Sequence, residues 1–296
     1  MEGVGWSTKG TGILYGILLI SFCLISCVED FPESPLESDA ALLLANPNGV
    51  ADSFFARSPD SFADLAIWFK ADDLGLTDGD PVITWSDASG LGNDAFSGVA
   101  VQQPLFLESS LNGLPALQFD GTDDEMQSTD IEFDSHTIIV VARFTNPFPG
   151  SDYRMNLLSK HHNFPNHSTA LYFNWRNSGL SYASFRNSVD GTTEFFSGGP
   201  ANQNEWYVVS GTFNGIVSSL FLNGELSDVS DLNSGDINNT SFPFYIARNA
   251  NTLAHRFKGE IAEIIMYSEH LSDQSRVEIE CYLSLKYNLS LPHNCI

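Results

Sequence analysis

From residue 64 onward, short runs rich in Val, Ile, Phe, Tyr and Trp alternate with turn-forming residues. Such runs suit a pleated, half-buried surface and predict β-strands. Period-two alternation is clearest in LYFNW, where Leu171, Phe173 and Trp175 share one face and the intervening residues point the other way. The predicted strands are Leu65–Lys70, Ala116–Phe119, Thr137–Phe144, Leu171–Trp175, Leu180–Arg186, Trp206–Phe213, Ile216–Leu222, Phe244–Ala247 and Glu260–Tyr267.

Turn-forming dipeptides predict how some of these strands connect. Asn214-Gly215 and Asn223-Gly224 flank the run Ile216–Leu222, and both suit two-residue hairpins with positive φ. They predict a three-stranded antiparallel meander. Many short strands with almost no helix predict an all-β, two-sheet antiparallel sandwich, because parallel βαβ units would need intervening helices.

One helix is predicted near the end of the chain. Ser272 provides an N-cap, an acid follows it, and the helix should run to about Tyr287. Val277, Cys281 and Leu285 recur every fourth residue and form an apolar stripe. We expect this stripe to dock on the sandwich.

The chain begins with features of an exported protein. Residues 13–26 form an uncharged apolar run of about 14 residues, which is short for a spanning helix and matches the core of a signal peptide. The run ends in LISC at Cys27, which resembles the lipobox of bacterial lipoproteins. This resemblance implies a signal peptide over residues 1–27 and a lipid on Cys27. The alternative is an ordinary secretory signal or a membrane anchor.

The resemblance to lipoproteins also implies a location. Val28, rather than Asp, follows the lipobox cysteine, and by analogy with lipoprotein sorting this favours the outer membrane. Residues 28–62 mix acids, Ser, Pro and Asn without periodicity and predict a flexible tether. The folded domain is then expected over residues 63–296, with membrane attachment only through the N-terminal lipid.

Charge and cysteine content narrow the function classes. Asp and Glu number 37 against 13 Lys and Arg, giving a formal net charge of −24. Such a surface repels phosphate backbones, so nucleic acid is excluded as a partner. Cys281 and Cys295 stand alone near the C-terminus of an exported chain and predict one disulfide, with two buried free thiols as the alternative.

Three stretches of the sequence carry recognisable motifs. The first is W-x-D-x-S-G-x-G-N-x-A at Trp85 to Ala95, followed by N-G-x-P-A-x-x-F-D-G at Asn112 to Gly121. The second is EWYVVSGTFNGIVSSLFLNGEL, and the third is FKGEIAEIIMYSEHLSDQSRVEIECYLSLKY. Together they bracket residues 64–288 and resemble the laminin-G-like, concanavalin A-like jelly-roll family of secreted bacterial proteins. The resemblance implies a jelly-roll sandwich but fixes no function, because this fold hosts lectins, adhesive modules, hydrolases and lyases.

No recognisable catalytic constellation is found in the sequence. Glycoside hydrolases on this fold need two carboxylates a few ångströms apart, and the run Asp130–Asp134 resembles the laminarinase-type motif only loosely. The Arg-rich strand and Gln-x-His of alginate-lyase relatives are missing. His161, His162 and His167 lie in a Pro- and Asn-containing stretch that presets no tetrahedral zinc geometry. We therefore predict no catalytic residues.

Calcium is the cofactor that the sequence favours. Asp120, Asp123 and Asp124 follow a predicted strand in a tight Gly-containing turn, and Asp87 in the Gly-rich loop would join them. Carboxylate oxygens are the ligands that calcium prefers. In the alternative interpretation these acids only accept hydrogen bonds from turn amides.

A glycan site needs an aromatic ring that stacks on a sugar and polar groups that fix its hydroxyls. The segment over residues 172–187 supplies both kinds of side chain. The predicted ligand-binding residues are Tyr172, Asn174, Trp175, Arg176, Tyr182, Arg186 and Asn187. We thus predict a surface-anchored, non-catalytic module that binds carbohydrate or an extracellular protein. The alternatives are a polysaccharide hydrolase or lyase on the same fold, and a structural or adhesive envelope lipoprotein.

Overall fold

The computed structural model describes residues 53–145, 153–160, 168–175, 181–189, 192–231, 235–249 and 255–296. They belong to the compact unit Asn46–Ile296 and form two antiparallel sheets packed face to face. This confirms the predicted all-β sandwich with one C-terminal helix. Among the described residues, no helix combines the length and hydropathy needed to span a bilayer.

The first sheet follows the order β15-β14-β13-β8-β17-β6-β5, and β2 also pairs with β17. Its strands are β15 (Glu225–Ser230), β14 (Ser218–Leu222), β13 (Tyr207–Phe213), β8 (His136–Phe144), β17 (Lys258–Tyr267), β6 (Leu114–Asp120), β5 (Leu105–Leu111) and β2 (Leu65–Lys70). All of the nine predicted strands overlap a strand of one sheet or the other, and Leu65–Lys70 has the predicted bounds.

The second sheet follows the order β12-β11-β10-β9-β16-β7-β4-β3. Its strands are β12 (Thr192–Pro200), β11 (Ser181–Val189), β10 (Thr169–Trp175), β9 (Tyr153–Ser159), β16 (Tyr245–Ile246), β7 (Met126–Gln127), β4 (Ala95–Phe96) and β3 (Thr84–Trp85). Short 3₁₀ turns lie at Pro59–Ser61 (η1), Ala71–Asp73 (η2) and Ala100–Gln102 (η3). Aromatic and aliphatic side chains from both inner faces fill the space between the sheets. Phe69 and Trp85, for example, stack with ring centroids 5.5 Å apart.

The predicted meander β13-β14-β15 is present, but its two turns differ. Asn223 and Gly224 both have positive φ, 51° and 83°, as a two-residue hairpin requires. At the other turn only Gly215 has positive φ, 89°. The Asn214 side chain accepts hydrogen bonds from the backbone N–H groups of residues 216 and 217, which widens the loop to four residues. The prediction of a two-residue turn at Asn214-Gly215 is therefore wrong, and β14 begins later than expected.

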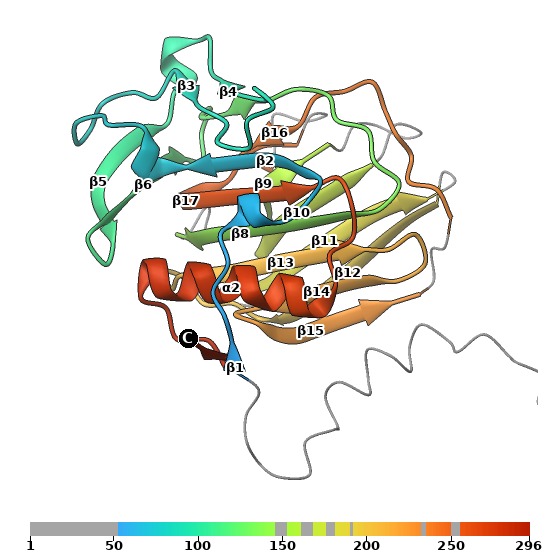
Figure 1. Cartoon of the computed structure of the whole chain (residues 1–296). Helices are drawn as coiled ribbons and strands as arrows, with labels where there is room; N and C mark the ends of the chain where they lie inside the picture. Colours follow the sequence, from blue (N-terminus) through green and yellow to red (C-terminus); the bar gives the residue numbers. More distant parts are fainter. Residues whose placement is uncertain are drawn as a thin grey trace, which may run out of the picture. The chain divides into compact units, whose positions relative to one another are not determined.

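Helix α2 (Asp273–Tyr287) has the predicted bounds and lies on the outer face of the first sheet (Figure 1). The Ser272 hydroxyl caps it by accepting a hydrogen bond from the backbone N–H of residue 275, 3.2 Å away. The residues that contact the sheet are Ile279, Leu283 and Tyr287. Leu285, which was expected in the apolar stripe, is 56% exposed. The stripe was misassigned because a second i, i+4, i+8 series, two residues along, carries the bulkier apolar side chains.

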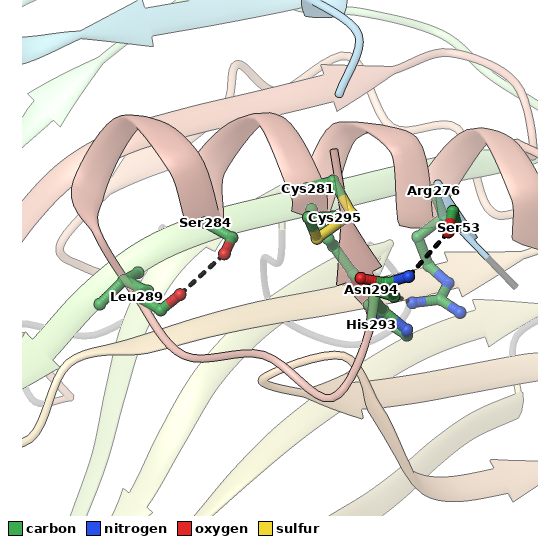
Figure 2. Close-up of a disulfide and its surroundings, with 9 residues drawn as sticks. Ser53, Arg276, Cys281, Ser284, Leu289, His293, Asn294 and Cys295 are labelled. Carbon is green, nitrogen blue, oxygen red and sulfur yellow. Dashed lines mark hydrogen bonds and ion pairs between the residues drawn. A yellow bond between two sulfur atoms is a disulfide. The ribbon is translucent and has the colours of Figure 1, made fainter. Parts of the chain in front are cut away.

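The two ends of the described chain are joined beside α2. The predicted disulfide between Cys281 and Cys295 is present, and it attaches β18 (Asn294–Cys295) to the helix (Figure 2). β18 pairs in parallel with β1 (Ser53–Phe54). Arg57 donates its backbone N–H to the carbonyl of Glu278. Residues 53–62 are thus part of the fold, which corrects the predicted end of the tether at residue 62. The predicted signal peptide, Cys27 and residues 28–52 lie outside the described residues.

Candidate functional site

The outer face of the second sheet carries its polar and aromatic side chains. Residues directly opposite each other on antiparallel strands share a face. Met126 and Ile246 form such a pair and lie in the core, so the next pair, Gln127 and Tyr245, faces outward. Phe96 on β4 pairs with Gln127 and shares that outward face. Phe96 and Gln127 of this row are exposed, whereas the Arg248 guanidinium lies over the Tyr245 ring, 4.6 Å from its centroid.

Four of the predicted ligand-binding residues lie together on this outer face. Tyr172 and Asn174 point outward from β10, because Leu171 and Phe173 of the same strand lie in the core. Tyr182 and Arg186 share the outward face of the neighbouring strand β11. However, Tyr172, Asn174 and Arg186 are only 3%, 7% and 5% exposed. Side chains this buried do not offer the open ring face that stacking on a sugar requires.

The electrostatics of this buried group are unusual. Burial lowers the pKa of Arg186 to about 9, an effect that Tyr172 opposes and the nearby Arg154 strengthens. Burial also lowers the pKa of His255, again with a contribution from Arg154. Clusters of groups with shifted pKa values are more frequent at functional sites than elsewhere.

The other predicted ligand-binding residues do not join this group. Asn187 points into the sandwich, where its Nδ2 donates a 2.9 Å hydrogen bond to Ser218 Oγ of the first sheet. It therefore links the two sheets and is removed from the set. Trp175 is described by its backbone alone, and Arg176 lies outside the described residues, as does the histidine-containing segment 161–167.

The acidic turn after β6 brings three predicted metal ligands together. Oxygen atoms of Asp120, Asp123 and Asp124 lie within 4.8 Å of one another. Asp120 Oδ1 accepts a hydrogen bond from the backbone N–H of Thr122, and Asp124 Oδ2 accepts one from that of Asp120. Each of these two carboxylates keeps a second oxygen for a ligand. The donor set fits a hard cation such as calcium.

Burial and hydrogen bonding shift the pKa values of Asp120 and Asp124 in opposite directions. Burial raises the pKa of Asp124 to about 7, and the neighbouring Asp120 and Asp123 charges add to the rise. Against the effect of burial, backbone N–H groups hold the pKa of Asp120 below its usual value. A bound cation would favour the ionised form of both residues.

Asp87, the fourth predicted metal ligand, lies in a different arrangement. Its carboxylate accepts hydrogen bonds from the backbone N–H groups of Trp68, Ser89 and Asn93 and from the Ser89 hydroxyl. It orders the Gly-rich loop before β4 and is not among the clustered carboxylates. For this residue the alternative interpretation, hydrogen bonding to turn amides, describes the structure.

A pocket of about 520 Å³ lies beside the acidic turn, at the end of the second sheet that carries β4 and β7. This volume is within the range of small-molecule sites. Its lining includes the Phe96 ring, the carboxylates of Asp94 and Glu125, and the amides of Gln102 and Gln127. The sequence reasoning assigned none of these five residues to a site.

The pocket combines an exposed ring with uncommitted amides. Phe96 is 54% exposed. A Cβ on Gly98 would come within 2.8 Å of the ring's Cε1 atom, so a glycine at this position leaves room for the ring. The side-chain amides of Gln102 and Gln127 make no hydrogen bond to any described residue. They are free to bind a ligand.

Two arginines bind Glu125 in the pocket wall, and one of them, Arg256, couples the wall to the acidic turn. Glu125 contacts Arg248 at 2.6 Å and Arg256 at 2.8 Å, one guanidinium to each carboxylate oxygen. Arg256 also donates to the carbonyl of Asp123, 2.8 Å away. Asp94 accepts a hydrogen bond from the backbone N–H of Asp87 through one oxygen, 2.8 Å away. Charge on this wall is therefore fixed by paired groups.

The comparison with known families agrees with this architecture. Residues 120–275, more than half of the chain, match the laminin-G family of the concanavalin A-like lectin/glucanases superfamily. The chain belongs to this superfamily. Among curated proteins, none matches this chain in sequence.

Solved structures share the fold of this concanavalin A-like chain. The binding domain of Paraclostridial mosquitocidal protein 1 has a TM-score of 0.54 at 13% identity, covering 75% of this chain and 52% of that binding domain. Domain 4 of AbnA, a GH43 extracellular arabinanase from Geobacillus stearothermophilus, was solved in complex with arabinotriose. It has a TM-score of 0.51 at 12% identity, covering 73% of this chain and 98% of the AbnA domain.

A third similar structure is an enzyme. Trypanosoma rangeli sialidase in complex with the inhibitor DANA has a TM-score of 0.51 at 13% identity, covering 76% of this chain and 33% of the sialidase. The chain thus spans about half of the mosquitocidal protein's binding domain and a third of the sialidase. At these identities the similarities concern the fold alone, a lectin-like jelly roll found in binding domains and in an enzyme.

Proposed function

We propose that this protein is a non-catalytic binding module that binds carbohydrate through the pocket on the outer face of the second sheet. The observation that carries the proposal is an exposed Phe96 ring in a pocket also lined by Gln102 and Gln127, whose side-chain amides bind no described residue. An aromatic ring stacks on the apolar face of a sugar, while amides and carboxylates bind its hydroxyls. The lectin-like fold, shared with binding domains, supports this proposal.

The proposal includes calcium and a lipid anchor. The cluster of Asp120, Asp123 and Asp124 would hold calcium, and Arg256 would transmit its effect to Glu125 in the pocket wall. A lipid on Cys27 would attach the protein to the cell envelope, in the outer membrane, with residues 28–52 between lipid and fold. This placement would present the pocket to extracellular glycans, while an extracellular protein ligand is the alternative partner.

A glycan array with the purified full chain tests the proposal. We expect binding to a defined class of glycan, reduced by Phe96→Ala and weakened when a chelator removes calcium. The matched control is Phe55→Ala, because Phe55 is 66% exposed and lies next to β1, outside the pocket. Equal loss in both variants, or no binding to any glycan with or without calcium, would overturn the carbohydrate proposal. The second result would favour an adhesive or structural role.

The second candidate function is a polysaccharide hydrolase or lyase. It is favoured by the lowered pKa values of Arg186 and His255, which fit a catalytic environment. Tyr172 contributes to the electrostatics of Arg186. Incubation with a polysaccharide panel, followed by assays for new reducing ends and unsaturated sugars, tests this function. Cleavage that is abolished by Tyr172→Phe would establish it, and the absence of products would exclude it for those substrates.

A further inference from the structure

The pocket has a charge pattern that selects among sugars. Of the described residues that line it, Asp94 and Glu125 are acidic and none is Lys or Arg. The guanidiniums of Arg248 and Arg256 lie behind the lining, one on each oxygen of Glu125, and Arg256 also faces the acidic turn. Counting the three carboxylates of that turn, acidic groups outnumber basic ones around the pocket, and an incoming carboxylate or sulfate would face the Asp94 carboxylate directly. Like charges at close range disfavour binding.

The uncommitted groups of the pocket match hydroxyl groups. The amides of Gln102 and Gln127 each offer two N–H donors and one carbonyl acceptor, and neither is bound to a described residue. The second oxygen of Asp94 adds an acceptor. A sugar hydroxyl both donates and accepts, so it can satisfy such a mixed set, whereas a carboxylate only accepts.

Apolar surface completes the pocket. Phe96 and Val99 line it and are 54% and 52% exposed. Stacking a neutral pyranose or furanose ring on Phe96 would remove this apolar area from water without desolvating a charge. From these observations, and resting on the proposed carbohydrate function, we propose that the pocket takes an uncharged sugar residue of a neutral glycan and rejects uronic, sialic and sulfated sugars.

Calorimetric titration of the full chain with matched neutral and acidic oligosaccharides tests this inference. The probes are cellotriose, xylotriose, mannotriose and arabinotriose against trigalacturonate, sialyllactose and a sulfated trisaccharide. We expect at least one neutral probe to bind at least tenfold more tightly than any acidic probe. Its affinity should change little between low and high salt, because no charge is neutralised on binding.

Variants assign that binding to the pocket. We expect Phe96→Ala to weaken binding of the neutral probe at least tenfold and Gln127→Ala to weaken it about fivefold. The affinity of Phe55→Ala should equal that of the wild type. Asp94→Asn keeps the oxygen that accepts from the backbone N–H of Asp87 but removes the charge. Asp94→Asn should reduce the ratio of affinities between neutral and acidic probes severalfold. The variant should unfold at the same temperature as the wild type.

The outcomes separate this inference from the proposed function. Tighter, Phe96-dependent binding of an acidic probe would overturn the inference and leave the carbohydrate function standing. Neutral binding that ignores both Phe96 and Gln127 would overturn the pocket as its site. Failure of every probe to bind would contradict the carbohydrate function together with the inference.

Discussion

The two outer faces of the sandwich use their polar groups in opposite ways. On the first sheet, α2 covers an apolar surface that includes Ile139 and Val208, and the charges there are paired inside the fold. Buried Glu263, for example, accepts hydrogen bonds from Trp68 Nε1 at 2.6 Å and from Lys286 Nζ at 2.8 Å. Burial raises the pKa of Glu263, and these donors counteract the rise.

On the second sheet, two side-chain amides in the pocket have no partner among the described residues. They belong to Gln102 and Gln127, and beside them Phe96 exposes more than half of its surface. Gln127 is exposed and Gln102 half-buried, so both amides can bind water or a ligand, whereas the buried carboxylate of Glu263 needs its partners because an unpaired buried polar group costs free energy. Under the proposed function, the first outer face serves stability and the second serves recognition. Substitutions on the two faces and between the sheets should therefore differ in their cost to stability.

The largest effect is expected under α2. Leu283 is fully buried against the first sheet, whereas Leu285, two residues further on, is 56% exposed. Leu283→Ala should lower the free energy of unfolding by about 3 kcal/mol, from lost burial and the cavity left behind. Leu285→Ala should change it by less than about 0.5 kcal/mol. Urea unfolding of both variants measures the difference, and equal costs would contradict the packing of the helix described above.

A similar effect is expected from the disulfide that fastens the C-terminal segment to α2. Cys281 and Cys295 are separated by 14 positions, and a loop of this length contributes about 3 kcal/mol in the chain-entropy model. Replacing both cysteines by Ala should lower the urea midpoint accordingly and release β18, and with it β1. Hydrogen exchange at Phe54 and Ile296 should report this release. Reduction of the wild type is the control, and unchanged stability in both would contradict the role given to the bridge.

An intermediate effect is expected between the sheets, at a residue that belongs to neither outer face. His136 is fully buried beside Phe133, Phe185 and Phe213, and burial lowers its pKa from 6.5 to about 3. Because the unfolded chain binds the proton and the folded chain does not, this stabilisation is complete above pH 6.5. It is lost progressively as the pH falls towards 3.

The comparison of wild type with His136→Gln isolates this residue from other titrating groups. Between pH 7 and pH 5 the free energy of unfolding of the wild type should fall by about 2 kcal/mol more than that of the variant. Unfolding in urea at pH 7, 6 and 5 provides the measurement. Parallel pH profiles for the two proteins would show that His136 does not titrate with a lowered pKa.

Local signals were sufficient to predict most of the fold. Ser272 and the apolar spacing after it gave the bounds of α2, and the isolated pair of cysteines gave the disulfide. Strand β5 was missed because LFLESSL shows no clear alternation. Its hairpin with β6 nevertheless had a sequence signal, since Asn112 and Gly113 adopt positive φ values of 52° and 90°.

The site was less predictable because distant segments build it. Glu125 contacts Arg248, 123 positions away, and no local pattern indicates that pair. Phe96 is one of 22 Phe residues, most of which resemble core residues in sequence. Asn187 lies one residue beyond the predicted strand Leu180–Arg186, so no face was predicted for it. The structure extends β11 to Val189 and puts Asn187 on the same face as Phe185, inside the sandwich.

The smallest effect on stability is expected in the pocket, where the effect on ligand binding is largest. Without ligand, Phe96→Ala and Phe55→Ala should each change the free energy of unfolding by less than about 0.5 kcal/mol, since both rings are largely exposed. With a neutral glycan at a hundred times its Kd, the free energy of unfolding of the wild type should rise by about 2.7 kcal/mol. A tenfold weaker Phe96→Ala variant should gain only about 1.4 kcal/mol, whereas Phe55→Ala should gain as much as the wild type. Thermal unfolding with and without glycan measures these gains. A large loss of stability in ligand-free Phe96→Ala would place this ring among the residues that hold the fold together and would remove the distinction between the two faces.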